Sequence, residues 1–143
     1  MKTKLTTILL VLTAGVAFGH GGIELGPNKG RIVELSTNET MHGEVTEKDG
    51  KLHIALLDKD MKPVVIAAQE ITATAGTREA PEKLAVGKSD TGFVISAPPA
   101  GQWMILQYKE RADAKTIIAR LHFNTKVCDP CKQPEWRCAC AMK

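Results

Sequence analysis

Between residues 31 and 125, apolar and polar residues alternate with a period of two, in short segments separated by turn-forming residues. This period is typical of strands that bury one face, because successive side chains of a strand point to opposite sides of a sheet. The pattern predicts strands over residues 31–36, 40–48, 51–57, 63–68, 71–77, 83–86, 92–96, 103–109 and 116–124. We predict no helix in this part of the chain.

The Asp49-Gly50 dipeptide predicts a two-residue hairpin turn, because such a turn needs residues that accept a positive φ. The turn fixes the register of the hairpin and pairs Val45 with Ile54. The face that contains this pair is expected to point into the core, and its members are Gly43, Val45, Leu52, Ile54 and Leu56.

The opposite face of the hairpin carries His42, Glu44 and His53. The two histidines lie several residue pairs apart, so they are not expected to hold one ion by themselves. Met41 and His42 together have the residue types of a copper site, and we keep His42 as a candidate metal ligand although adjacent strand residues point to opposite faces. Glu44 and Arg120 are interpreted as part of a solvated sheet surface.

Many short antiparallel strands at a spacing of about 8–12 residues are typical of a β-sandwich. The fold class predicted for residues 31–125 is therefore all-β, a small Ig-like antiparallel sandwich of about seven or more strands. Pro81, Pro98 and Pro99 interrupt the connections between strands. A glycine-rich segment at residues 20–30 is expected before the domain and a cysteine-rich tail at residues 126–143 after it.

Residues 1–19 have the features of a secretory signal peptide. Lys2 and Lys4 precede an apolar stretch, and the small residues Ala17 and Gly19 stand at the positions expected for cleavage before His20. The apolar stretch is short for a membrane span. We therefore predict a periplasmic or secreted protein with no membrane span after cleavage.

Cleavage after Gly19 makes His20 the first residue of the exported chain. A free α-amine and an imidazole on the same residue can chelate one ion, and this pair of nitrogen donors favours Cu(II). Cleavage after Ala17 instead places His20 third, which also gives a nitrogen ligand set for Cu(II) or Ni(II). The alternative is that the glycine-rich start binds nothing.

Composition excludes several functions. The formal charge of +3 falls by two, to +1, when the leader is removed with Lys2 and Lys4, which leaves no basic stripe for nucleic acid. Aromatic residues make up 4% of the chain, too few for a base-stacking surface. No nucleophile motif and no glycine-rich phosphate loop is present, so we do not expect an enzyme.

All four cysteines lie near the C-terminus with the spacing C-x2-C-x6-C-x-C: Cys128, Cys131, Cys138 and Cys140. A first interpretation is two structural disulfides, which an oxidising compartment permits; the pairing of Cys138 with Cys140 is the least favourable because its ring is strained. A second is a four-thiolate site for Cu(I) or Zn(II), helped by nearby basic residues. A redox couple at Cys128 and Cys131 is the least favoured, because no helix follows to lower the pKa.

Two stretches of sequence carry a resemblance to a known class of proteins. His20-Gly21-Gly22, followed by residues 26–34 (GPNKGRIVE) and residues 56–64 (LLDKDMKPV), resembles small periplasmic β-sandwich proteins of heavy-metal resistance and efflux. More loosely, the chain resembles copper-resistance sandwiches that use an N-terminal histidine. Where that class often has further histidines, this chain has Asn28 and Lys29, so the resemblance implies His20 alone as a ligand.

These observations lead to two hypotheses of function. The first is an exported, non-enzymatic protein for copper handling or resistance in the periplasm, with metal ligands drawn from His20, His42 and the four cysteines, and with an envelope metal-efflux component as a possible partner. Copper is the expected ion and zinc the alternative. The second is an envelope interaction module stapled by disulfides, which holds no metal.

Overall fold

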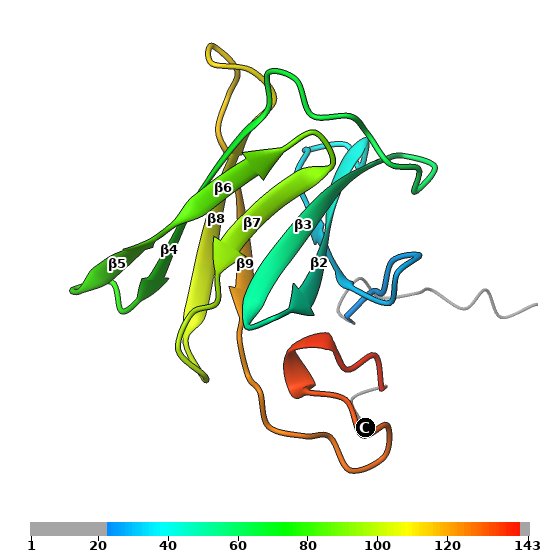
Figure 1. The fold of residues 1–143 in the computed structure, drawn as a ribbon, viewed down its shortest axis with the longest axis vertical. Coiled ribbons are helices and arrows are strands. Elements are labelled where there is room, and N and C mark those ends of the chain that lie inside the picture. The colour runs from blue at the N-terminus through cyan, green and yellow to red at the C-terminus, as the bar shows by residue number, and fades with distance from the viewer. Residues whose placement is uncertain (1–22, 141–143) are drawn as a thin grey trace, which may run out of the picture.

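The computed structural model describes residues 23–140 and shows two antiparallel sheets packed face to face (Figure 1). The predicted all-β sandwich is confirmed. The leader and His20 lie outside the described residues, as do residues 141–143.

The first sheet has five strands in the order β1-β2-β3-β7-β6. Their bounds are β1 (Arg31–Glu34), β2 (Met41–Lys48), β3 (Lys51–Asp58), β7 (Gly92–Ser96) and β6 (Val86–Ser89). All four neighbouring pairs are antiparallel, as expected for a chain that connects most strands by short turns.

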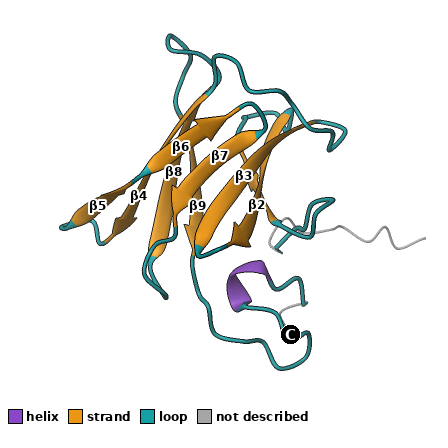
Figure 2. Cartoon of the chain, viewed as in Figure 1, coloured by secondary structure: helices purple, strands orange, loops and turns teal. Residues whose placement is uncertain are grey.

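The second sheet has four strands in the order β5-β4-β8-β9. Their bounds are β5 (Pro81–Leu84), β4 (Glu70–Gly76), β8 (Trp103–Lys109) and β9 (Ile117–His122). After β9 the chain continues into the cysteine tail, where a single turn of 3-10 helix, η1 (Glu135–Arg137), is formed (Figure 2).

The predicted β2–β3 hairpin is confirmed in its register. Val45 pairs with Ile54, and Asp49 and Gly50 form the turn, both with positive φ. The inward face is fully buried and contributes Val45, Leu52, Ile54 and Leu56 to the core. The predicted alternation is also confirmed in β9, since Ala119 and Leu121 are buried whereas Ile118 and Arg120 are exposed.

Residues 63–68, predicted as a strand, do not form one. Only Pro63 makes a bridge, to Leu57, and the chain then crosses from the first sheet to the second. Pro63 has no N–H to donate, and Met61, two residues before it, has a φ of 58°, which turns the chain out of an extended path. Ile66 is nevertheless buried, so its apolar character reflects the core beneath a crossover.

The strand predicted at residues 83–86 is divided between the two sheets. Its beginning belongs to β5, which pairs with β4, and its end belongs to β6, which pairs with β7. Ala85 is the point of change, and its carbonyl accepts a hydrogen bond from the N–H of Ser96. Alternation alone cannot reveal a strand that changes sheets.

Glu44, interpreted from the sequence as solvated, is buried with only 1% of its surface exposed. Its carboxylate accepts hydrogen bonds from the backbone N–H and the side-chain amide of Asn28 and from the backbone N–H of Gly30. The segment before β1 therefore covers this face of β2. A Cβ on Gly30 would lie 2.7 Å from the Cγ of Glu44, so the close approach requires glycine.

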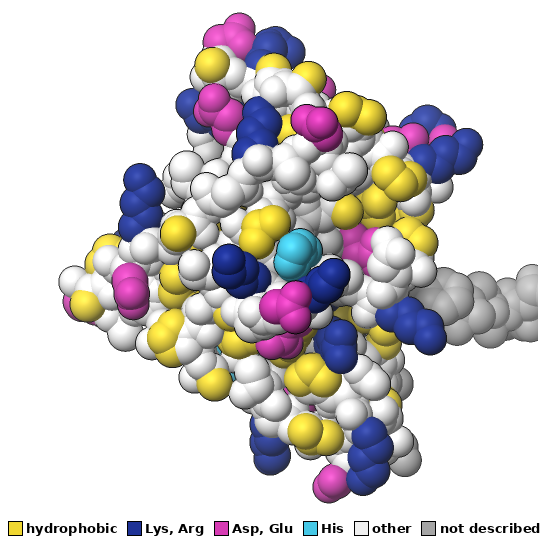
Figure 3. Space-filling view, in the orientation of Figure 1, with side chains coloured by type: hydrophobic (Ala, Val, Ile, Leu, Met, Phe, Trp, Pro, Cys, Tyr) yellow, Lys and Arg dark blue, Asp and Glu magenta, His cyan; other side chains and the backbone are white. Residues whose placement is uncertain are grey.

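The face of the molecule drawn in Figure 3 carries mixed charge. On this face, lysines and arginines are interspersed with acidic residues, and no large area of one sign is formed. Across residues 23–140, no helix has both the length and the apolar character needed to cross a membrane.

Candidate metal centre

The first two cysteines belong to residues 127–134, a segment that lies below the ends of the strands in Figure 1. Val127 and Pro134 form an isolated bridge at the base of this segment, and the N–H of Cys128 donates to the carbonyl of Gln133 at 2.8 Å. The carbonyl of Cys128 accepts from the N–H of Lys132, also at 2.8 Å. Lys132 has a φ of 57°, and this left-handed residue reverses the chain directly after Cys131.

The last two cysteines follow η1. The N–H of Cys138 donates to the carbonyl of Glu135 at 3.2 Å, which ends the helical turn, and Cys138 itself returns to an extended conformation. The backbone N–H of Cys140 then lies 3.4 Å from the Sγ of Cys138, within hydrogen-bond range for sulfur. The C-x-C spacing thus brings a second pair of sulfurs to one place.

The two pairs meet. All four Sγ atoms lie within 4.8 Å of one another, and a contact between the pairs, from Cys131 to Cys138, is 3.4 Å. A disulfide requires about 2.05 Å, and none of the four cysteines is disulfide-bonded. Four thiolates bound to one ion at about 2.3 Å have sulfurs about 3.8 Å apart, close to what is found here. The arrangement is therefore compatible with a four-sulfur metal site.

Backbone N–H groups and neighbouring thiols, rather than lysine or arginine charges, set the acidity of these cysteines. The pKa of Cys131 is lowered to about 7, chiefly by the backbone N–H of Gln133, with further help from the other thiols. For Cys128 the largest influence on the pKa is the N–H of Cys131, which lowers it, but thiol neighbours and burial outweigh it and the net change is upward. Hydrogen bonds with Cys131 and Cys138 raise the pKa of Cys140 to about 12.

One lowered and two raised pKa values are what a cluster of hydrogen-bonded thiols produces. The thiol that ionises first accepts hydrogen bonds from neighbouring thiols, and those neighbours then lose their protons less readily. The sequence argument disfavoured a redox couple at Cys128 and Cys131 because no helix follows to lower the pKa. No helix follows directly, yet the pKa of Cys131 is lowered, because backbone N–H groups of a tight turn can act on a thiolate as a helix N-terminus does.

The cysteine tail is anchored to the sandwich by Trp136, which lies in η1 and has only 1% of its surface exposed. Its ring packs against Phe123, with centroids 5.6 Å apart, and its backbone N–H donates to the carbonyl of Asn124 at 2.9 Å. The guanidinium of Arg31, at the start of β1, donates to the carbonyl of Trp136 at 2.9 Å. The four-cysteine cluster therefore lies at the end of the sandwich where β1 begins and β9 ends.

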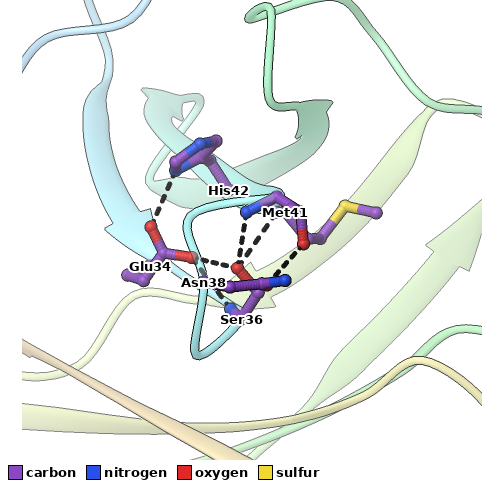
Figure 4. Close-up of polar contacts among 6 residues, drawn as sticks. Glu34, Ser36, Asn38, Met41 and His42 are labelled. Carbon is purple, nitrogen blue, oxygen red and sulfur yellow. Dashed lines mark hydrogen bonds and ion pairs between the residues drawn. The ribbon is translucent and has the colours of Figure 1, made fainter.

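His42, the other candidate ligand within the described residues, is not part of the four-cysteine cluster. It is buried on β2, and its Nδ1 lies 3.0 Å from the Oε2 of Glu34, without the alignment of a hydrogen bond (Figure 4). The other oxygen of Glu34 accepts from the N–H and the hydroxyl of Ser36, which fixes this carboxylate beside the imidazole. Met41 points away from His42, as the strand alternation predicted.

His42 lines a surface cavity of about 370 Å³ together with Glu34, Glu39 and Met61. His53 pairs with Thr46 and lies well along β3 from His42, which pairs with Leu57, so the predicted separation of the two histidines is confirmed. The role of His42 as a ligand stays a prediction, as does that of His20.

Sequence reasoning missed the residues that position the cluster. Trp136 follows the cysteine pair Cys128–Cys131 in the chain, yet it belongs to the core of the sandwich. Arg31 and Gln133 carry no signal in a single sequence, because each acts through one hydrogen bond that only the folded chain creates. The one available signal was a large aromatic residue inside a short, polar, cysteine-rich segment.

Comparison with protein-family models, with curated proteins and with solved structures gives no match for this chain.

Proposed function

We propose that this protein is an exported, non-enzymatic metal-binding protein that holds one thiophilic ion in its four-cysteine cluster and handles copper in the periplasm. The observation that carries the proposal is the convergence of four Sγ atoms within 4.8 Å, from two separate turns, with no disulfide among them. Four thiols that converge without forming disulfides supply the soft sulfur ligands that select thiophilic ions such as Cu(I) and Zn(II).

The position of the cluster supports exchange of the ion with a partner. All four cysteines are partly exposed at the end of the domain, so a second protein can reach them without unfolding the sandwich. Thiolates select Cu(I) and Zn(II) among biological ions. The export leader, the resemblance of the N-terminal half to metal-resistance sandwiches, and the amine and imidazole of His20 all favour copper as cargo.

A second candidate ion is favoured by the sulfur spacing. The sulfurs lie within 4.8 Å of one another, with one pair at 3.4 Å, and the about 3.8 Å separation of a tetrahedral four-thiolate site, the usual geometry of structural Zn(II), falls in this range. In that case the ion fastens the cysteine tail to the sandwich, and the copper role falls to His20. The competing hypothesis without metal, a disulfide-stapled module, requires the sulfurs to approach from 3.4 Å to bonding distance.

The test is a native mass spectrum of the purified protein, kept anaerobic, after addition of Cu(I) and of Zn(II) separately and in competition. We expect one bound ion per chain, with Cu(I) displacing Zn(II). The variant Cys138→Ser should lose most of the affinity for both ions, whereas His53→Ala, a half-buried histidine on β3, should keep it. A mass lower than the reduced chain by four hydrogens, with no bound ion, would refute the proposal in favour of two disulfides.

A further inference from the structure

Trp136 is shared by the candidate metal centre and the hydrophobic core. In the chain it lies between Cys131 and Cys138, two residues before the latter. In space its ring lies in the core and packs against Phe123. Within residues 126–140 it is the one fully buried side chain. The position of the last cysteine pair and the insertion of this ring are therefore set by the same short turn, η1.

The insertion of Trp136 buries polar groups at a cost. Its Nε1 and the Nε of the adjacent Arg137 are both buried with no hydrogen-bond partner among residues 23–140. The guanidinium of Arg31 is partly desolvated, and burial lowers its pKa. These costs oppose the gain from burying the indole ring, so the contact with the sandwich is weaker than the buried area alone indicates.

The rest of the cysteine tail has little to hold it in place. Residues 126–140 contain one isolated bridge and one turn of 3-10 helix, and neither element is stable alone. Ordering these residues costs conformational entropy at each position. An ion bound by both cysteine pairs joins Cys128 to Cys140 and closes this segment, which supplies the stabilisation that the tail lacks.

We propose that ion binding and insertion of Trp136 are coupled, so that the loaded cluster holds Trp136 in the end of the sandwich and loss of the ion releases it. This inference rests on the proposed function, since it assumes that the four cysteines bind an ion. The coupling makes the β1–β9 end of the domain differ between the two forms. Phe123 and the carbonyl of Asn124 are covered in the ion-loaded protein and exposed in the ion-free protein.

The two tryptophans allow a direct measurement. Trp103 is 52% exposed on β8, where it stacks on His122, so its replacement leaves the core intact. In the Trp103→Phe variant, Trp136 is the single fluorescent tryptophan. Zn(II) is the probe because it is redox-inert and does not quench tryptophan emission, whereas Cu(I) is readily oxidised to Cu(II), which does quench it. We compare the reduced protein with one equivalent of Zn(II) and with a chelator in excess.

We expect the loaded variant to emit at short wavelength and to resist quenching by acrylamide. Removal of Zn(II) should shift the emission toward that of an exposed indole and raise the quenching severalfold, while the far-ultraviolet circular dichroism of the sheets is unchanged. Identical emission and quenching with and without one bound Zn(II) would overturn the coupling and leave the proposed function intact. Absence of bound Zn(II) and Cu(I) in the mass spectrum would overturn both.

Coupling must also act in the reverse direction, because linkage is reciprocal. Trp136→Ala changes no ligand, yet it should weaken Zn(II) binding by about tenfold, a typical coupling between two sites. Trp103→Ala is the matched control and should bind as the original protein does. If Trp136→Ala does not fold, Trp136→Phe, which keeps a smaller ring, should show a smaller loss in the same direction. Unchanged affinity in a folded Trp136 variant would contradict the inference.

Discussion

The acidity of the four cysteines makes ion binding depend steeply on pH, because each thiol must lose its proton to become a ligand. Above pH 7, Cys131 is mostly a thiolate, since its pKa is lowered to about 7. Cys128 and Cys140 still hold their protons there, because the pKa of the first is raised above its ordinary value and that of the second to about 12. Binding therefore releases at least two protons in this range.

The magnitude follows from the proton count. Each proton released changes the binding constant tenfold per pH unit, which is about 1.4 kcal/mol. Affinity should rise at least about a hundredfold from pH 7 to pH 8. Below pH 7, Cys131 is protonated too, and the slope should steepen to at least about a thousandfold per unit. Affinity thus falls as the pH falls, most steeply on the acid side of neutrality.

The assay is competition with a chromophoric chelator of known pH dependence, from pH 6 to pH 9, under anaerobic conditions. The Cys131→Ser variant is the informative comparison. It should bind the ion more weakly at every pH, and its plot of affinity against pH should lack the change of slope near pH 7, because the thiol that titrates there is gone. The matched Cys140→Ser variant should keep that change of slope. An affinity that is independent of pH, or a slope of one proton or less above pH 7, would refute the assigned acidities.

Further predictions concern the fold and the effect of the ion on stability. Glu44→Ala leaves the N–H groups of Asn28 and Gly30 without their acceptor and should lower the free energy of unfolding by about 3 kcal/mol in urea denaturation; Glu47→Ala, exposed on the same strand, should change it by less than about 0.5 kcal/mol. Gly30→Ala should cost about 1–3 kcal/mol, since its Cβ would meet Glu44 at 2.7 Å. Chelation should lower the melting temperature measured by calorimetry, because an ion that binds the folded chain stabilises it by mass action; an unchanged melting temperature would show that the ion is not bound.

The fold was largely predictable from the sequence because its information is local. The period of two marked the strands, and Asp49-Gly50 fixed the hairpin to the correct residue pair. The failures have physical reasons that no local pattern contains. A strand can change sheets at Ala85, and an apolar run that includes Ile66 can cover the core without pairing.

The four cysteines of the candidate site were predictable from the sequence, but the surroundings that position them were not. The C-x2-C and C-x-C spacings indicated the four cysteines as a candidate metal site, and in the structure their sulfurs lie close together. The packing of Trp136 in the core, and the hydrogen bond from the Arg31 guanidinium to the Trp136 carbonyl, depend on contacts between distant parts of the chain. Glu44 was misinterpreted for the same reason, because the segment that buries it follows no periodic pattern.

X-ray absorption at the metal edge of the loaded, anaerobic protein tests the central claim most directly. For the Zn(II) form, a shell of four sulfurs at about 2.3 Å is the predicted result. Nitrogen or oxygen neighbours at about 2.0–2.1 Å, in place of that sulfur shell, would show that the ion is held elsewhere and would contradict the account.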